Sequence, residues 1–235
     1  MLPRSVDCEA SSIGDGFARK AVAMRKVWTV SGADGLARLP SRNRPGRDAM
    51  LCWSSGEAAE RFALRAARNP RVNPIMLAQF ISDVLPKLRA LNRLVLPDWS
   101  GEPFHPEFEP GQVALRLKSE GIAQFCAAAM ERRRVFILED DIGPAFAASQ
   151  VNPDKLALPI WTSSEDAEFQ VRGFWSEMAV SEIPSVQFIE KTLPFVAGIG
   201  RGVSLDHGLG GVPTELSPLD LSARLMRFMP QRRIA

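Results

Sequence analysis

Two short segments of this 235-residue chain combine a tryptophan, small hydroxyl side chains and paired carboxylates. They are LCWSSGEAAE, residues 51 to 60, and PIWTSSEDAE, residues 159 to 168. The carboxylates are Glu57 and Glu60 in the first segment and Glu165 and Glu168 in the second. Two carboxylates one helical turn apart could act as a general acid and a general base.

A structural role explains the same residues without any chemistry. Ser54 with Glu57, and Thr162 with Glu165, match the capping box, in which a hydroxyl and a carboxylate satisfy the exposed backbone N–H groups where a helix starts. A carboxylate one turn further on also lies where the helix dipole favours negative charge. We therefore interpret both segments as strand-to-helix corners, with Trp53 and Trp161 packed over them and each indole N–H bonded to a nearby acceptor.

Histidines and glycines offer two further chemical candidates. Asp206 and His207 are adjacent and could form a dyad, but the only other histidine, His105, does not occupy the equivalent position. The glycine-rich stretch from 198 to 211 follows a predicted helix, whereas a phosphate-binding loop lies between a strand and the helix that it opens. We expect two turns around a short strand there.

Basic side chains and cysteines exclude further classes of site. Arginines cluster at 132 to 134, at 42 to 47 and in the last residues, without interleaved aromatics, and the formal net charge is only +2. Solvated surfaces explain such clusters, so we predict no nucleic-acid partner. Three cysteines with no Cys-x-x-Cys spacing indicate neither a disulfide framework nor a zinc site. We predict no metal and no cofactor.

The composition is that of an ordinary globular protein, with 46% hydrophobic and 24% charged residues. The N-terminal residues contain no apolar run typical of a signal peptide, and no stretch reaches the roughly 20 apolar residues of a membrane span. We expect a cytoplasmic protein that has no membrane partner.

The two Trp-containing segments belong to an internal duplication. An offset of 108 positions, the distance from Trp53 to Trp161, aligns the chain with itself without a gap. Roughly 28 of about 100 aligned positions are identical, against roughly 6 or 7 expected from shared composition. We predict a first domain at residues 14 to 117, a second at 120 to 226, and flexible tails at 1 to 13 and 228 to 235. The short junction favours packing of the copies over a flexible tether.

Hydrophobic periodicity predicts the same elements in each copy. A helix is followed by a strand, by a turn with Gly35 or Gly143 at positive φ, and by two more strands that lead to the Trp corner. A second apolar helix follows, with Asn73 as the expected cap in the first copy and Ser185 in the second. Pro86 and Pro194 predict a kink or an early end of that helix, before a closing strand and a helix that starts at a proline. The expected fold class is α+β, with two tandem homologous domains, each a small, mostly antiparallel sheet with helices on one face.

These residues resemble a bacterial domain-of-unknown-function family, number 2750, most clearly in the second copy. The resemblance is carried by ALPIW, SSEDAEF, FWSEMAVSEIPSVQFIEKTLPFV and the pair Pro218 and Leu221, and it covers roughly residues 120 to 225 and more faintly 14 to 117. The first copy departs from the pattern, because Ala67 replaces Trp175. If this second Trp is functional, only the second copy is competent. A more distant similarity is to the amino-terminal domain of enhancers of type III secretion.

Neither resemblance implies a reaction or a catalytic residue. We therefore predict a non-enzymatic protein that acts through protein–protein interaction, in an immunity or regulatory role. A homodimer is compatible with the sequence. The alternative is a small-ligand binder or an enzyme that uses a cleft between the two repeats. The candidate binding residues are all in the second copy: Trp161, Glu165, Phe174, Trp175, Arg201, Asp206 and His207.

Overall fold

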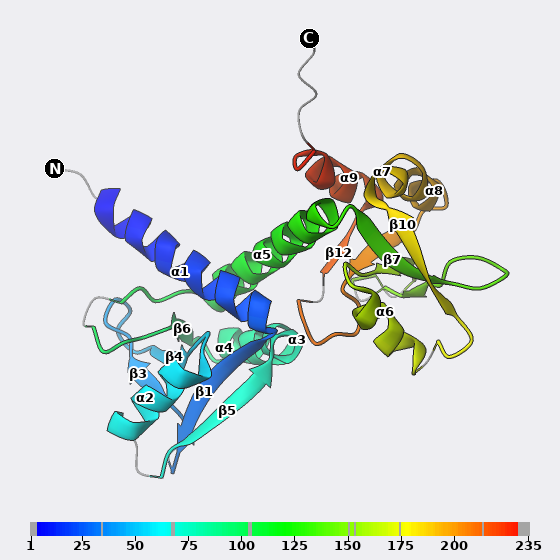
Figure 1. Ribbon diagram of the computed structural model, residues 1–235. Helices are drawn as coiled ribbons and strands as arrows, with labels where there is room; N and C mark the ends of the chain where they lie inside the picture. The colour runs from blue at the N-terminus through cyan, green and yellow to red at the C-terminus, as the bar shows by residue number, and fades with distance from the viewer. Residues whose placement is uncertain are drawn as a thin grey trace. The chain divides into compact units, whose positions relative to one another are not determined.

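The chain folds into two compact units that both combine helices and small sheets (Figure 1), which confirms the α+β class and the tandem arrangement. The computed structural model describes residues 4–33, 35–66, 69–102, 105–149, 151–152, 154–173, 175–212 and 214–229. The first domain comprises Met1–Gly121 with Gly210–Val212, and the second comprises Ile122–Leu209 with Pro213–Ala235.

The elements of the first domain begin and end with helices. In chain order they are α1 (Arg4–Met24), β1 (Lys26–Gly32), β2 (Gly35–Leu36), β3 (Arg38–Pro40), β4 (Asp48–Cys52), α2 (Gly56–Ala66), β5 (Arg71–Met76), α3 (Leu77–Gln79), the π-helical turn η1 (Phe80–Val84), α4 (Leu85–Ala90), β6 (Leu94–Pro97) and α5 (Pro110–Glu131).

The second domain repeats most of this order at the same offset, with the last turns of α5 as its first helix. Its elements are β7 (Arg134–Glu139), β8 (Ala147–Ala148), β9 (Leu156–Ile160), α6 (Ser164–Val171), β10 (Ala179–Pro184), α7 (Ser185–Gln187), η2 (Phe188–Thr192), α8 (Leu193–Gly198), β11 (Gly202–Leu205), β12 (Thr214–Leu216) and α9 (Pro218–Met226). The expected turn glycines have positive φ, 91° at Gly35 and 141° at Gly143.

In the part of the chain that the structure describes, each domain contains two small sheets. The orders are β2-β1-β5 and β3-β4-β6 in the first domain, and β10-β7 and β12-β11-β9-β8 in the second. Most neighbours are antiparallel, as predicted, but β4 pairs with β6, and β9 with β11, in parallel. Backbone bridges join the two sheets of each domain, from Trp28 to Trp53 and from Phe136 to Trp161.

Helices pack against both faces of the sheet β3-β4-β6 in the first domain. Along β4, Met50 packs into a core with α1, α4 and α5, whereas Leu51 packs into a second core with α2. Successive side chains of a strand point to opposite faces, and β4 is apolar at both kinds of position. A run of continuous apolar residues therefore required cover on both sides.

The start of the second apolar helix differs from the prediction. Asn73 lies inside β5, where its side-chain amide donates to Ser31 Oγ at 2.9 Å, and the helix begins at Leu77. Ser185 is the first residue of α7, and its hydroxyl donates to the carbonyl of Ala129 at 2.7 Å instead of capping. The helices start at equivalent positions because a strand that the prediction missed precedes each of them.

Pro86 and Pro194 do not end their helices. The turn before each proline is π-helical, with the Leu85 N–H bonded to the carbonyl of Phe80 and the Leu193 N–H bonded to that of Phe188. Proline has no N–H to donate into an α-helical ladder, and the wider turn accommodates this loss. The chain then continues as α4 or α8.

One helix spans the boundary between the domains. Helix α5 supplies the closing helix of the first domain and the opening helix of the second without a break (Figure 1), so the junction is helical and not a loop. At the other end of the first domain, α1 starts at Arg4, so residues 4 to 13, predicted as part of a flexible tail, are helical.

Candidate functional site

Parallel pairing brings two corners of the first domain together. Because β4 and β6 run in the same direction, their carboxyl ends lie at the same edge of the sheet, and the segments after them are neighbours. Ligands of mixed sheets commonly bind outside the carboxyl ends of parallel strands. Trp53 follows β4 here, and Asp98 and Trp99 follow β6.

Asp98 connects these two segments. Its carboxylate accepts from the backbone N–H of Ser54 at 2.7 Å and from the Ser54 hydroxyl at 2.8 and 3.0 Å. Ser54 is therefore not the helix cap that we predicted. The cap is Ser55, whose Oγ accepts from the Ala58 N–H at 3.3 Å, and in the second copy it is Ser163, which accepts from Asp166 at 3.3 Å.

The shared tryptophan is buried and its indole N–H finds an acceptor, as predicted. Trp53 Nε1 donates to the carbonyl of Trp99 at 3.1 Å. In the second copy, Trp161 Nε1 donates to the carbonyl of His207 at 3.0 Å. The same bond at equivalent positions shows that Trp53 and Trp161 hold the corner together as parts of the frame.

A pocket opens beside this frame in the first domain. Its volume is about 490 Å³, and it is lined by Trp53, Ala58, Arg61, Phe62, Arg65, Asp98, Trp99, Ser100 and Gly101. We call it the Trp99 pocket. Phe62 contacts both tryptophan rings, with its ring centroid 4.9 Å from that of Trp53 and 5.8 Å from that of Trp99. Phe62 and Trp99 are only partly buried, so the pocket presents aromatic surface to solvent.

The Trp99 pocket also contains two arginines and a tryptophan whose indole N–H is already hydrogen-bonded. Arg61 and Arg65 stand one turn apart on α2 and are exposed. Arg61 pairs with Glu57 at 3.2 Å on the same helix. The indole N–H of Trp99 donates to the carbonyl of Glu102 at 3.0 Å within its own loop, which fixes the ring and leaves no indole donor for a ligand.

A second hollow borders Trp99 on the side of β3. Its volume is about 310 Å³, and its lining includes the acids Glu102 and Glu107 together with Arg42 and His105. The His105 ring nitrogen Nε2 lies 2.6 Å from the carbonyl of Pro97, which attaches this loop to the end of β6. Trp99 thus lines two hollows of different charge.

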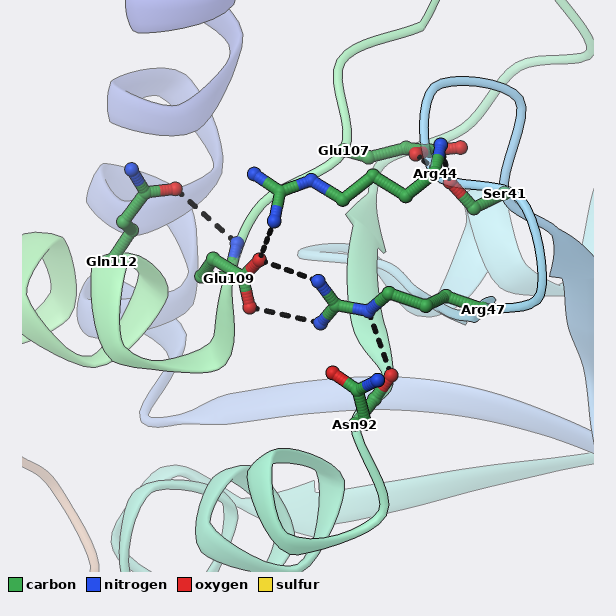
Figure 2. Close-up of polar contacts among 7 residues, drawn as sticks. All are labelled: Ser41, Arg44, Arg47, Asn92, Glu107, Glu109 and Gln112. Atoms are coloured by element: carbon green, nitrogen blue, oxygen red, sulfur yellow. Dashed lines mark hydrogen bonds and ion pairs between the residues drawn. The ribbon is translucent and has the colours of Figure 1, made fainter.

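Ion pairs beside this hollow take up two arginines of the basic cluster at 42 to 47. Figure 2 shows Arg44 and Arg47 pointing at Glu109, with contacts of 2.6 Å from Arg44 and of 2.7 and 3.0 Å from Arg47. The hydrogen bond from Arg47 lowers the pKa of Glu109, and in turn Glu109 raises the pKa of Arg47. Arg47 also donates to the carbonyl of Asn92 at 2.8 Å.

A serine holds the turn that carries these arginines. Ser41 Oγ donates to Glu107 at 2.6 Å and accepts from the Arg44 N–H at 2.9 Å. The second copy repeats the arrangement, because Ser149 Oγ donates to Glu215 at 2.5 Å and accepts from the Asn152 N–H at 2.8 Å. A contact shared by both copies at equivalent positions is best explained as part of the fold.

The equivalent corner of the second domain is packed differently. Trp175 is partly buried, and it packs against the core that contains Trp161 and meets the His207 ring edge-on at 5.6 Å. His207 Nδ1 lies 3.1 Å from the hydroxyl of buried Ser204, and burial lowers its pKa. Gln170, which replaces Phe62, reaches Gly208 so closely that a Cβ there would lie 2.5 Å from its oxygen.

The structure brings together only some of the predicted site residues. Trp161, Trp175 and His207 meet at the corner, and Asp206 adjoins them in the chain with its N–H bonded to the carbonyl of Ile160 at 2.9 Å. Phe174 lies outside the described residues.

Glu165 and Arg201 serve local roles. Glu165 accepts from Ser163 Oγ at 2.6 Å in the first turn of α6, and that bond lowers its pKa. Arg201 stacks over the ring of Phe146 at 3.9 Å, and it precedes β11, whereas His207 follows that strand. The length of β11 therefore separates Arg201 from the corner.

The prediction placed the candidate site in the second copy and missed the Trp99 pocket. Among the described residues of the pocket lining, only Trp53 and Asp98 are identical in the second copy. Phe169, Gln170 and Gly173 replace Arg61, Phe62 and Arg65, and His207 replaces Trp99. The alignment of the two copies could have located this pocket. The residues that hold the corner together are identical in both copies, whereas the residues around them differ, which indicates a site that one copy has changed.

Two kinds of feature are absent from the part of the chain that the structure describes. No group of three or more His, Cys, Asp or Glu side chains there could hold a metal ion. No helix there has both the length and the apolar character needed to cross a bilayer.

The fold and the repeated corner define a protein of two homologous α+β domains with a pocket in the first. The family model described as "Protein of unknown function (DUF2750)" matches twice, at residues 15–117 and 122–225. The chain therefore belongs to this family and carries two tandem copies of its domain. The resemblance to secretion enhancers stays a prediction.

Comparisons with other proteins add two distant similarities. Of the solved structures, "Anabaena Tic22 (protein transport)" is 14% identical, covers 92% of this chain and 98% of its own, and has a TM-score of 0.27. "Tic22 from Plasmodium falciparum" is 9% identical, covers 74% of this chain and 85% of its own, and has a TM-score of 0.25. No curated protein matches the chain.

Proposed function

We propose that this protein is not an enzyme and that it binds a protein partner through the Trp99 pocket, in an immunity or regulatory role. The observation that carries the proposal is the combination of partly exposed Phe62 and Trp99 with two exposed arginines around one hollow. Trp and Arg are enriched among the residues that dominate binding energy at protein interfaces, and such residues cluster in pockets. The immunity or regulatory role is an analogy at the level of fold.

The polar groups of the pocket support binding over catalysis. Among the described residues that line the pocket, Asp98 is the only carboxylate, and its oxygens accept from the N–H and the hydroxyl of Ser54. A general base must reach a substrate proton, and these bonds direct Asp98 toward the start of α2 instead. The remaining charged groups, Arg61 and Arg65, are suited to holding an anion.

A small-ligand binder is the second candidate, and the size of the pocket favours it. About 490 Å³ falls within the range of roughly 300 to 1,000 Å³ that is common for small-molecule sites. We expected such a ligand in a cleft between the repeats, whereas the pocket that supports this candidate lies within the first domain.

Exchange variants test the proposal. Trp99→His and Phe62→Gln introduce the residues that the second copy carries at these positions, in the same backbone frame. The matched control is Phe169→Ala, which removes an exposed aromatic side chain from α6 of the second domain. Tagged protein is cross-linked in a native lysate, and captured proteins are identified by mass spectrometry after circular dichroism has shown that each variant is folded.

We expect a specific protein to be captured by the wild type and by Phe169→Ala, and to be lost with either exchange variant. Capture that is unchanged by Trp99→His would overturn the proposal. A metabolite that copurifies with the wild type in native mass spectrometry, and is lost with Trp99→His while no protein depends on the pocket, would establish the second candidate instead.

A further inference from the structure

We infer that the Trp99 pocket selects an acidic segment of its partner, in which an apolar side chain rests on Phe62 and Trp99 and neighbouring carboxylates meet Arg65 and Arg61. This inference rests on the proposed function and adds the chemistry of the occupant. It follows from which charged side chains around the pocket already bond to other residues of the protein and which can bond to a ligand.

Arg65 is the more open of the two cations. Among the described residues, no carboxylate forms an ion pair with it. Arg61 does pair with Glu57, but both side chains are well exposed, 64% and 78%, and such a pair contributes little. A partner carboxylate could therefore engage Arg65 without breaking an existing contact, and Arg61 at small cost.

The acids near the pocket do not cancel this preference. The Asp98 carboxylate accepts from Ser54 at 2.7 to 3.0 Å, so its charge faces the start of α2, where N–H groups are gathered. Glu57 lies on the neighbouring turn of α2, next to Arg61. Arginine binds carboxylates with two parallel hydrogen bonds, which gives direction as well as attraction.

Two internal comparisons support the selection of anions. The second copy has Phe169 and Gly173 in place of Arg61 and Arg65, so the cations belong to the copy in which the pocket is found. The hollow on the other side of Trp99 is lined by Glu102 and Glu107 together with Arg42, and Glu107 already accepts from Ser41. That hollow therefore lacks the excess of cations found in the Trp99 pocket.

The test uses two capped tripeptides, acetylated and amidated, one with a tryptophan and two glutamates and one with a tryptophan and two lysines. Binding to the ¹⁵N-labelled full chain is followed by NMR, with the indole N–H signals of Trp53 and Trp99 as reporters. The variant Arg65→Glu reverses the charge of the side chain at position 65. The matched control is Arg89→Glu, the same change at an exposed position on α4 that does not line the pocket.

We expect the acidic peptide to bind with at least about five-fold higher affinity than the basic one, and Arg65→Glu to remove or invert this preference, because charge complementarity chiefly determines specificity. Arg89→Glu should leave the preference unchanged. Arg61→Gln, which avoids placing a second acid beside Glu57, should reduce it less than Arg65→Glu does.

Equal affinities for the two peptides, or a preference that survives Arg65→Glu, would overturn the inference. These outcomes are separate from those of the lysate experiment. A partner that is lost with Trp99→His although the peptides bind equally would leave the proposed function in place and remove only the acidic specificity.

Discussion

The carboxylate of Asp98 holds both the backbone N–H and the hydroxyl of Ser54, and so ties the end of β6 to the start of α2. Asp98 has a φ of 51°, and the equivalent Asp206 has a φ of 45°. Aspartate tolerates this left-handed conformation better than most residues do. The position thus requires a short side chain that accepts hydrogen bonds and accommodates positive φ.

Replacing Asp98 separates these two requirements. Asp98→Ala removes the acceptors, leaves the buried Ser54 N–H unsatisfied and adds backbone strain, which should lower the free energy of unfolding by about 2 to 4 kcal/mol. Asp98→Asn keeps one acceptor and tolerates the φ, so it should cost about half as much. Urea unfolding followed by circular dichroism measures both, and equal losses would contradict this account of the corner.

Cys126 should resist alkylation in the folded protein. Burial raises the pKa of its thiol to about 11 from 9.0, and burial likewise raises that of Cys52. In a Cys8→Ser background at pH 8, iodoacetamide should label both thiols much more slowly in buffer than in urea, on the order of a hundred-fold for Cys126 from the thiolate fraction alone. The raised pKa also makes the stability of the fold depend on pH. The stabilisation from the buried, protonated Cys126 thiol is complete below pH 9 and is lost as the pH rises toward 11.

His207 should make the second domain sensitive to acid. Burial lowers its pKa below the ordinary value of 6.5, so the unfolded chain takes up the proton first as the pH falls. The stabilisation is present above pH 6.5 and is lost below it. We expect His207→Gln to weaken the fall in the urea midpoint that the wild type shows between pH 7.5 and 5. An unchanged fall in His207→Gln would argue against a partly buried, neutral His207.

The Arg47 and Glu109 pair should show as a shifted carboxylate. Arg47→Met should return the pKa of Glu109 toward its ordinary 4.5, which a carboxyl NMR titration measures, and should lower the urea midpoint at pH 7. The lowered pKa means that the pair stabilises the fold above pH 4.5 and that this effect disappears as the pH falls through the folded value. Arg38→Met is the control, because the 3.7 Å pair of Arg38 with Asp48 is exposed and should matter less.

The repeat made much of the fold predictable. Comparing the two copies located the corner at Trp53 and Trp161, the turn glycines at 35 and 143, and the helix that begins at Pro110. It also contained the true caps, because Ser55 and Ser163 are identical, but the capping-box pattern drew the prediction to the neighbouring hydroxyl. Local patterns thus predicted the start of this helix to within one residue in both copies.

Tertiary pairing decided what local patterns could not. Asn73 followed by a proline is typical of a helix start, yet six residue pairs with β1 make this segment a strand. The parallel pairing of β4 with β6 also has no local signature, and it is this pairing that brings Trp99 to Phe62. The site was missed for the same reason, because its walls come from segments that meet only in the folded chain.

The π-helical turns before Pro86 and Pro194 carry a record of ancestry. Each is five residues long, and the turns occupy equivalent positions in the two copies of the family domain. A widened turn differs from an α-helical turn by one extra residue, and the constant offset of the alignment shows that neither copy has lost it. The simplest history places this turn in the single-domain ancestor, so it is older than the divergence that gave one copy its arginine-flanked pocket and the other its partly buried histidine.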